Sequence, residues 1–241
     1  MNPSRFNLTP VAVVLFFAIL ALAVVSSAGN SAWAANSSAG VGEGATHRHL
    51  HADLSDNLPP KVLKQLAFHD AMRKLWEDHI TWTRLFIVSA VADLPDTGPT
   101  AQRLLQNQSD IGDAIKPFYG DAAGEQLTTL LRDHILIAAD LVSAAKAGDT
   151  AAFEDARARW YANADEIAAF LHSANPENWP LDEMKAMMRE HLDLTLEEVG
   201  ARLNGDWAAD IAAYDQIHEQ ILEMADMLST GIIRQFPKAF K

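Results

Sequence analysis

Residues 61–93 read KVLKQLAFHDAMRKLWEDHITWTRLFIVSAVAD, and this stretch decides the fold class. Apolar and aromatic side chains recur along it at intervals of three and four residues, from Leu63 to Val91. This spacing places them on one face of a long α-helix. Two prolines precede the stretch, and LPDTGP at 94–99 follows it, which are typical start and stop signals for a helix.

The same helical spacing continues to the end of the chain, and no stretch alternates between apolar and polar residues as a strand would. Because the predicted connections are short, neighbouring helices should be antiparallel. We therefore expect an all-α fold, an up-and-down antiparallel bundle of about five long helices plus one shorter helix, with no solenoid repeat. The further helices are predicted at 100–115 (the shorter one), 121–147, 150–173, 181–203 and 206–234.

Composition excludes several classes of function. The chain has 241 residues, with 32 acidic against 19 basic side chains and a formal net charge of −13. Such a surface repels phosphates, so nucleic acid is not an expected partner. The absence of cysteine excludes disulfides, thiolate metal sites, covalently attached haem and a cysteine nucleophile.

The first 34 residues have the order of a signal peptide. Arg5 precedes an apolar run at 11–25, and Ala32-Trp33-Ala34 fits the small-residue pattern before a cleavage site. The run of 25 − 11 + 1 = 15 residues is shorter than the roughly 20 that span a bilayer. We predict cleavage after Ala34, export to the periplasm or the exterior, and no stable membrane insertion afterwards. The alternative is an uncleaved membrane anchor.

Residues 35–57 are rich in small and polar side chains without helical period, and we predict a flexible linker ahead of a helical domain at 58–241. His47, His49 and His51 alternate within this linker. Such a tract can capture metal ions weakly, or it can be a solvated tail without function.

Four of the nine histidines share one property. His79, His134, His191 and His218 each lie near the middle of a different long predicted helix. In an antiparallel bundle of helices of similar length, midpoints meet at one depth. We therefore predict a polar layer of four imidazoles, which are ligands for transition metals.

Three carboxylates are candidates to support this layer. Asp165 and Glu166 lie at the middle of the helix without a central histidine, and Asp215 lies one turn before His218. At the same depth, a carboxylate can ligate the metal or accept a ring N–H and fix the tautomer of a histidine.

The expected cofactor is a transition-metal ion, and copper, zinc and iron all suit imidazole. Met184, Met187 and Met188 lie seven, four and three residues before His191 and can share its helix face. Thioether sulfur favours copper. Methionines at this spacing are also common core residues.

Two other functions remain open from the sequence. A single buried histidine is commonly a core residue with a hydrogen-bond partner, so the layer can be a structural or interaction feature that sets helix register. The bundle can also bind a small ligand or a b-type haem, since a haem held by two histidines leaves no sequence motif. An enzyme is the least supported class, because Glu-x-x-His, His-Glu-x-x-His and Gly-x-Ser-x-Gly are all absent.

Four stretches, at 76–84 (WEDHITWTR), 131–134 (LRDH), 160–166 (WYANADE) and 231–237 (GIIRQFP), form a familiar set. They resemble a group of small exported bacterial helical proteins of unknown function. The resemblance extends over roughly residues 70–240. It implies a bacterial, periplasmic or secreted setting, and it implies no chemistry.

Overall fold

The computed structural model describes residues 58–241, and within them it contains six α-helices and no strand. This confirms the all-α prediction. The predicted signal peptide, the linker and its histidines lie outside the described residues. The helices are α2 (Pro60–Val91), α3 (Thr97–Tyr119), α4 (Asp121–Ala147), α5 (Thr150–Ala174), α6 (Leu181–Leu203) and α7 (Trp207–Gln235).

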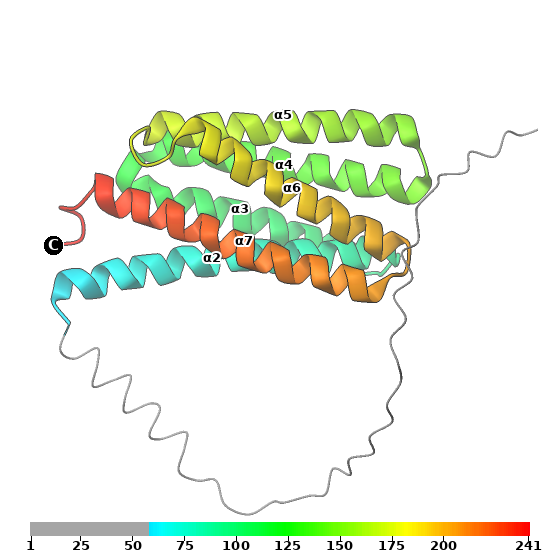
Figure 1. Cartoon of the computed structure of the whole chain (residues 1–241), viewed down its shortest axis with the longest axis horizontal. Helices are drawn as coiled ribbons and strands as arrows, with labels where there is room; N and C mark the ends of the chain where they lie inside the picture. Colours follow the sequence, from blue (N-terminus) through cyan, green and yellow to red (C-terminus); the bar gives the residue numbers. More distant parts are fainter. Residues whose placement is uncertain (1–57) are drawn as a thin grey trace, which may run out of the picture. The chain divides into compact units, whose positions relative to one another are not determined.

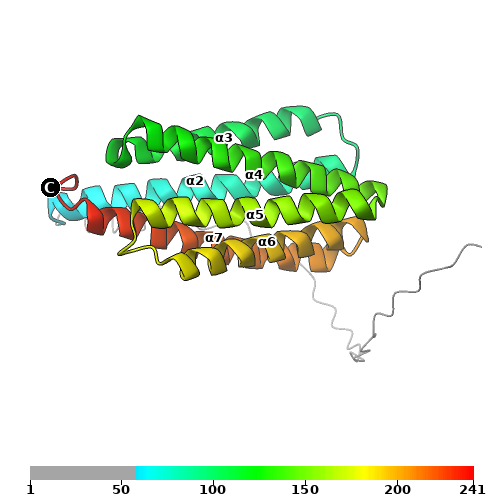
Figure 2. The same ribbon diagram turned by 90° about the horizontal axis from the view of Figure 1, so that it is seen from above.

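Each helix packs beside the next one along the chain, with alternating direction (Figures 1 and 2). Helix α7 also packs against α2, so the antiparallel neighbours form a closed bundle, and α2 makes further contacts with α4 and α6. The up-and-down arrangement is as predicted. Among the described helices, none is both long and apolar enough to cross a membrane.

Helix α3 differs from the expected short helix at 100–115. It has 23 residues, as many as α6, and Thr100 is buried inside it. Pro117 lies in its last turn, where a missing N–H removes a single bond near the end of the helix. The helix instead ends at Tyr119, and its C-cap is Gly120, whose φ of 84° is readily adopted only by glycine.

Two helix starts have aspartate caps. Asp149 precedes α5 and its carboxylate accepts a hydrogen bond from the N–H of Ala152 at 3.0 Å. Asp206 precedes α7 and accepts from the N–H of Ala209 at 3.0 Å. These bonds satisfy backbone donors that the helix leaves free at its first turn.

The six helices form three antiparallel hairpins, α2–α3, α4–α5 and α6–α7, which carry a common polar pair. The first helix of each hairpin contributes a histidine, and the spacings are 134 − 79 = 55 and 191 − 134 = 57 residues. The second helix contributes an amide side chain that donates to the backbone carbonyl four residues before that histidine. The three bonds are Asn107 Nδ2 to Leu75 O at 3.0 Å, Asn163 Nδ2 to Leu130 O at 3.1 Å, and Gln220 Nε2 to Met187 O at 3.1 Å.

The positions around the histidines repeat as well, so the first helices present matching layers to the bundle interior. The repeat is hard to see in the sequence, because only a few inward-facing positions share it and the outward-facing residues differ. The three hairpins close into a bundle and do not stack into a solenoid. The layers are Trp76, Leu131 and Met188 at three residues before the histidines; Thr83, Ala138 and Thr195 at four residues after them; and Ile87, Val142 and Val199, a separate apolar cluster, at eight residues after them.

Candidate functional site

Three of the four predicted histidines come together. His79, His134 and His191 have exposed fractions of only 3%, 3% and 5%, and all three line one cavity of ≈ 30 Å³. The ring centres of His79 and His191 are 5.6 Å apart. We call these three residues the histidine layer.

His218 does not belong to the histidine layer. It is partly exposed, and its Nε2 lies 3.0 Å from Oε1 of Glu77 at the bundle surface. The physical reason is its helix face: His218 lies two residues before Gln220, and the equivalent residues of the other hairpins, Leu105 and Tyr161, are also not fully buried. His218 lies near the middle of α7, as predicted. Its side chain is on a face of the helix that does not border the cavity.

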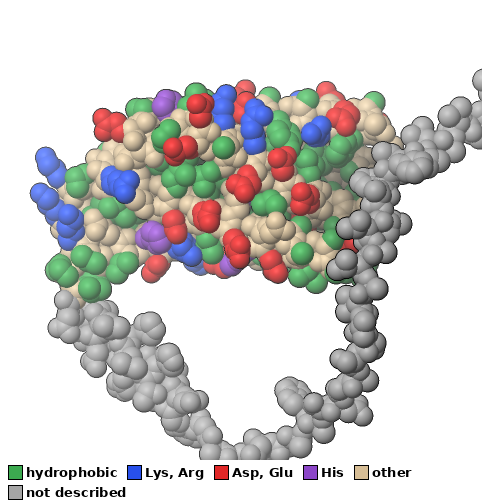
Figure 3. Space-filling view, in the orientation of Figure 1, with side chains coloured by type: hydrophobic (Ala, Val, Ile, Leu, Met, Phe, Trp, Pro, Cys, Tyr) green, Lys and Arg blue, Asp and Glu red, His purple; other side chains and the backbone are tan. Residues whose placement is uncertain are grey.

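The three predicted carboxylates also lie away from the cavity. Asp165 forms ion pairs with Arg189 at 2.9 Å and Lys185 at 3.5 Å on the outer side of α5. Glu166 and Asp215 are exposed. On the face that Figure 3 shows, acidic side chains are scattered among basic and uncharged ones.

An amide takes the place expected for a carboxylate beside His134. Asn163, on α5, donates through Nδ2 to Leu130 O, so its Oδ1 is the acceptor that faces His134 Nδ1 at 2.8 Å. Nδ1 therefore carries the proton, and Nε2 keeps its lone pair. This is the tautomer of a histidine that ligates through Nε2.

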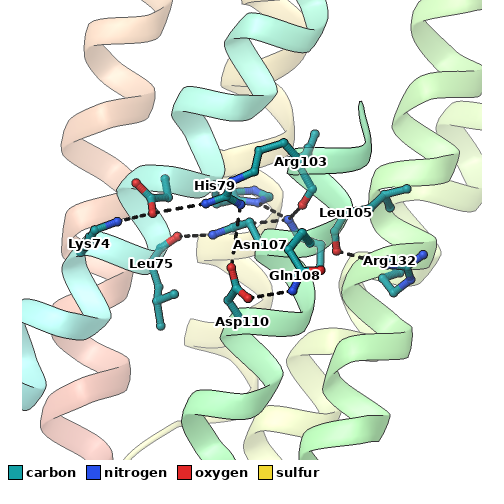
Figure 4. A network of polar contacts seen from close by, with 12 residues as sticks. Lys74, Leu75, His79, Arg103, Leu105, Asn107, Gln108, Asp110 and Arg132 are labelled. Atoms are coloured by element: carbon teal, nitrogen blue, oxygen red, sulfur yellow. Dashed lines mark hydrogen bonds and ion pairs between the residues drawn. The ribbon is translucent and has the colours of Figure 1, made fainter. Parts of the chain in front are cut away.

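His79 contacts a second amide, which Figure 4 shows together with its partners. Nε2 of Gln108 lies 3.3 Å from His79 Nδ1, 3.1 Å from Asn107 Oδ1 and 2.8 Å from Leu104 O. The amide thus shares two hydrogens among three acceptors, and Gln108 Oε1 is buried without a partner.

His191 is the least satisfied ring of the three. Its Nδ1 is buried and has no hydrogen-bond partner. Gln220, its counterpart on α7, uses Nε2 to donate to Met187 O. Buried polar atoms without partners are uncommon, and they point to strain or to an unseen water or ion.

Burial keeps all three imidazoles neutral. It lowers the pKa of His134 to about 3 and that of His191 to about 4, and it holds the pKa of His79 well below its ordinary value. Repulsion from His191 lowers the pKa of His79 and His134 further. The neutral ring is the form that binds a metal ion.

The remaining walls of the cavity are almost entirely apolar. Trp160, on α5, lies beside His134 with ring centres 5.2 Å apart and ring planes inclined by 32°, and its Nε1 is buried without a partner. Thr83 and Thr195 donate their hydroxyls to the backbone carbonyls of His79 and His191, both at 2.8 Å. No Asp, Glu, Lys or Arg is among the residues that line the cavity.

The side chains do not form a finished metal site as they stand. Within residues 58–241, no three or more His, Asp or Glu side chains are placed to hold one ion directly. The histidine layer must therefore turn its rings toward a common point to bind. The terminal torsion of histidine is broad, so such a rotation requires no change of backbone.

A second buried polar cluster, which the sequence did not reveal, joins α2, α6 and α7. Arg84 Nη1 donates to Glu198 Oε1 at 2.6 Å and to Asp210 Oδ1 at 2.8 Å, and Arg202 Nη1 donates to Asp210 Oδ2 at 3.0 Å. Glu198 and Asp210 are only 2% and 1% exposed. We call these four residues the Arg84 cluster.

The charges of the Arg84 cluster are matched within it. Burial raises the pKa of Glu198 to about 7, against the lowering effect of Arg84. Burial lowers the pKa of Arg84, but its contacts with Asp210 and Glu198 raise it more. Arg84 also lies over the ring of Tyr214, 4.7 Å from its centre.

One sequence signal separates the three converging histidines from His218. Each of the three follows an acidic residue and precedes Ile or Leu, as in DHI at 78–80, DHI at 133–135 and EHL at 190–192, whereas His218 follows Ile217. In contrast, the amide partners Asn107, Asn163 and Gln220 become recognisable only through their contacts.

Comparisons of the chain with protein-family models, with curated proteins and with solved structures find no match.

Proposed function

We propose that this protein is an exported metal-binding helical bundle in which His79, His134 and His191 hold one transition-metal ion. The observation that carries the proposal is that three buried histidines, from equivalent positions of three hairpins, line one small cavity. Bundle-core metal sites are built in this way, from side chains on facing helices.

The tautomer of His134 supports this proposal. Its Nδ1–H is held by Asn163, which is itself oriented by Leu130 O, so Nε2 is an acceptor. Partners of this kind fix the orientation of a ligating ring and increase its basicity.

The ring spacing supports it as well. Two imidazoles that share one ion, with metal–nitrogen bonds of about 2.0–2.1 Å, have ring centres about 5–5.5 Å apart. The observed separation of His79 and His191 is 5.6 Å, so these rings need rotation more than translation to share an ion.

The identity of the metal rests on the imidazoles alone. Copper, zinc, iron and nickel all accept imidazole ligands. Met184 and Met188 are buried in the core, but neither lines the cavity. The cavity therefore provides no thioether ligand that would favour copper.

A structural role for the histidine layer is the second candidate. It is favoured by the finding that, among the described residues, no three ligands are yet placed around one point. In this case, the layer would set the register of the three hairpins, as buried polar groups do in some bundles. Haem gains no support, because a cavity of ≈ 30 Å³ holds one or two water molecules and not a porphyrin.

The export part of the proposal rests on the sequence of residues 1–34. It is tested by intact-mass measurement of the protein recovered from the periplasm of a bacterial host. Cleavage after Ala34 supports it, and a full-length protein that stays with the membrane fraction contradicts it.

The metal is tested with the full chain purified without an affinity tag. We expect about one equivalent of metal per chain by elemental analysis, or after titration with Zn²⁺, Co²⁺ or Cu⁺. His134→Leu, which removes a ligand and keeps an apolar volume, should lose it. His218→Ala is the matched control and should retain it.

Equal metal content in the wild type and in His134→Leu would contradict the proposal. Asn163→Ala provides a second variant with all three ligands intact. It should bind metal about 10–100-fold more weakly, because the tautomer of His134 is no longer held. A purely structural layer would predict the same metal content in the wild type, His134→Leu and Asn163→Ala.

A further inference from the structure

The cavity lies on one side of the histidine layer only. On one side, Trp76, Leu131 and Met188 are fully packed, and none of them borders the cavity. On the other side, the layers at four and at eight residues after the histidines both border the cavity. These residues are Thr83, Ala138 and Thr195, and then Ile87, Val142 and Val199. An ion held by three histidines would therefore have one closed face and one open face.

The open face has room for very little. A volume of ≈ 30 Å³ holds about one or two molecules of the size of water. The hydroxyls of Thr83 and Thr195 already donate to backbone carbonyls, and the other walls are apolar apart from Trp160 Nε1. A molecule in the cavity would find the ion as its main polar partner.

Charge decides which kind of molecule fits. Three neutral imidazoles leave a divalent ion with its full charge, and no carboxylate lines the cavity to offset it. Glu198, on α6, is not among the lining residues and is bound to Arg84. An uncompensated charge in an apolar interior is costly, and a negative ligand reduces that cost.

We infer that the cavity is a binding site for a small monoanion, hydroxide or an anion of about one to three atoms, as the fourth ligand of a divalent ion. This inference rests on the proposed function, because the ion provides the attraction. The bound anion lies between the histidine layer and Ile87, Val142 and Val199.

The anion needs a route for exchange, which we place at Phe86. An open surface pocket between the C-terminal parts of α2 and α4 shares two wall residues, Phe86 and Val142, with the cavity. Val142 is buried, whereas Phe86 is only partly buried. Movement of the Phe86 side chain would connect the cavity to this pocket, and thus to solvent.

The test uses the full chain loaded with Co²⁺, whose visible absorption reports its coordination, and azide as the probe anion. We expect a saturable change in the spectrum with about one azide per cobalt. Ala138→Leu fills the cavity and leaves the histidines in place. It should retain cobalt and bind azide at least tenfold more weakly.

Ala162→Leu, on the exposed side of α5, is the matched control and should behave as the wild type. Phe86→Ala provides a second variant, in which azide should bind at least tenfold faster while cobalt content is unchanged.

Cobalt that binds stoichiometrically but does not respond to azide overturns this inference and leaves the proposed function standing. A wild type that binds no cobalt defeats the proposed function itself. Wild-type azide affinity in Ala138→Leu, or an unchanged rate in Phe86→Ala, overturns the placement of the anion or its route.

Discussion

The histidine layer and the Arg84 cluster are both buried in one bundle, but they satisfy their polar atoms in different ways. Around Arg84, each buried carboxylate meets a guanidinium within 2.6–3.0 Å. In the histidine layer, the rings are neutral, and His191 Nδ1 has no partner.

Their places in the repeat differ as well. The histidine layer takes one residue from each hairpin, whereas Glu198 occupies a position at which the first two hairpins have Phe86 and Leu141. An ionic cluster that is complete in itself can hold helices together. A set of equivalent imidazoles whose ring nitrogens do not all have hydrogen-bond partners is better suited to bind a ligand. Four predictions test this difference, from the largest expected effect to the smallest.

Breaking the Arg84 cluster should have the largest effect. Arg84→Met leaves Glu198 without its cation and Asp210 with Arg202 alone. We expect the free energy of unfolding to fall by about 3–5 kcal/mol, since the two buried carboxyl groups lose the guanidinium that binds both of them. Urea unfolding measures this loss. Arg73→Met, which breaks a half-exposed pair with Asp226, is the control and should cost about 0–1 kcal/mol. Equal losses in the two variants would remove the distinction.

Removing the amide at His134 should have a smaller but clear effect. Asn163→Ala leaves His134 Nδ1–H without its acceptor and removes the side-chain hydrogen bond to Leu130 O, which keeps only its bond within α4. We expect a loss of about 1–3 kcal/mol in metal-free protein. The exposed amide variant Gln106→Ala should stay within about 0.5 kcal/mol of the wild type. An unchanged free energy of unfolding in Asn163→Ala would mean that a water molecule replaces the amide. The histidine layer would then be accessible to water despite its burial.

Acid should destabilise the histidine layer. The pKa of His191 is lowered to about 4 in the folded protein, against about 6.5 when unfolded. Above pH 6.5 both states are neutral and the stability is fully present. Below it, the unfolded state binds the proton first, and stability falls until about pH 4.

His191→Met removes this dependence. Between pH 7 and pH 5, with a chelator present, we expect the variant to lose about 2 kcal/mol less than the wild type in urea unfolding. Parallel curves for the two proteins would show that His191 is not held neutral by burial.

The smallest effect is expected at His218. Its ring meets Glu77 at the surface, where an ion pair contributes little. His218→Ala should change the free energy of unfolding by less than about 0.5 kcal/mol. A large loss in a thermal or urea melt would place His218 with the buried groups after all.

Much of the fold follows from the spacing of apolar residues. The helix at 61–93 was predictable because a helix face repeats every three to four residues. The end of α3 was not, since a proline commonly ends a helix, whereas α3 continues past Pro117 to Tyr119.

The sequence by itself determined an all-α bundle and the common depth of the histidines, because rise per residue converts position in a helix into depth. Only the tertiary structure decided which histidines face each other, because a helix turns by a full circle every 3.6 residues and an error of one or two residues reverses the face. It therefore placed His79, His134 and His191 around one cavity and left His218 outside. It also decided that Asn163 rather than Asp165 accompanies His134, since that choice depends on which side of α5 packs against α4.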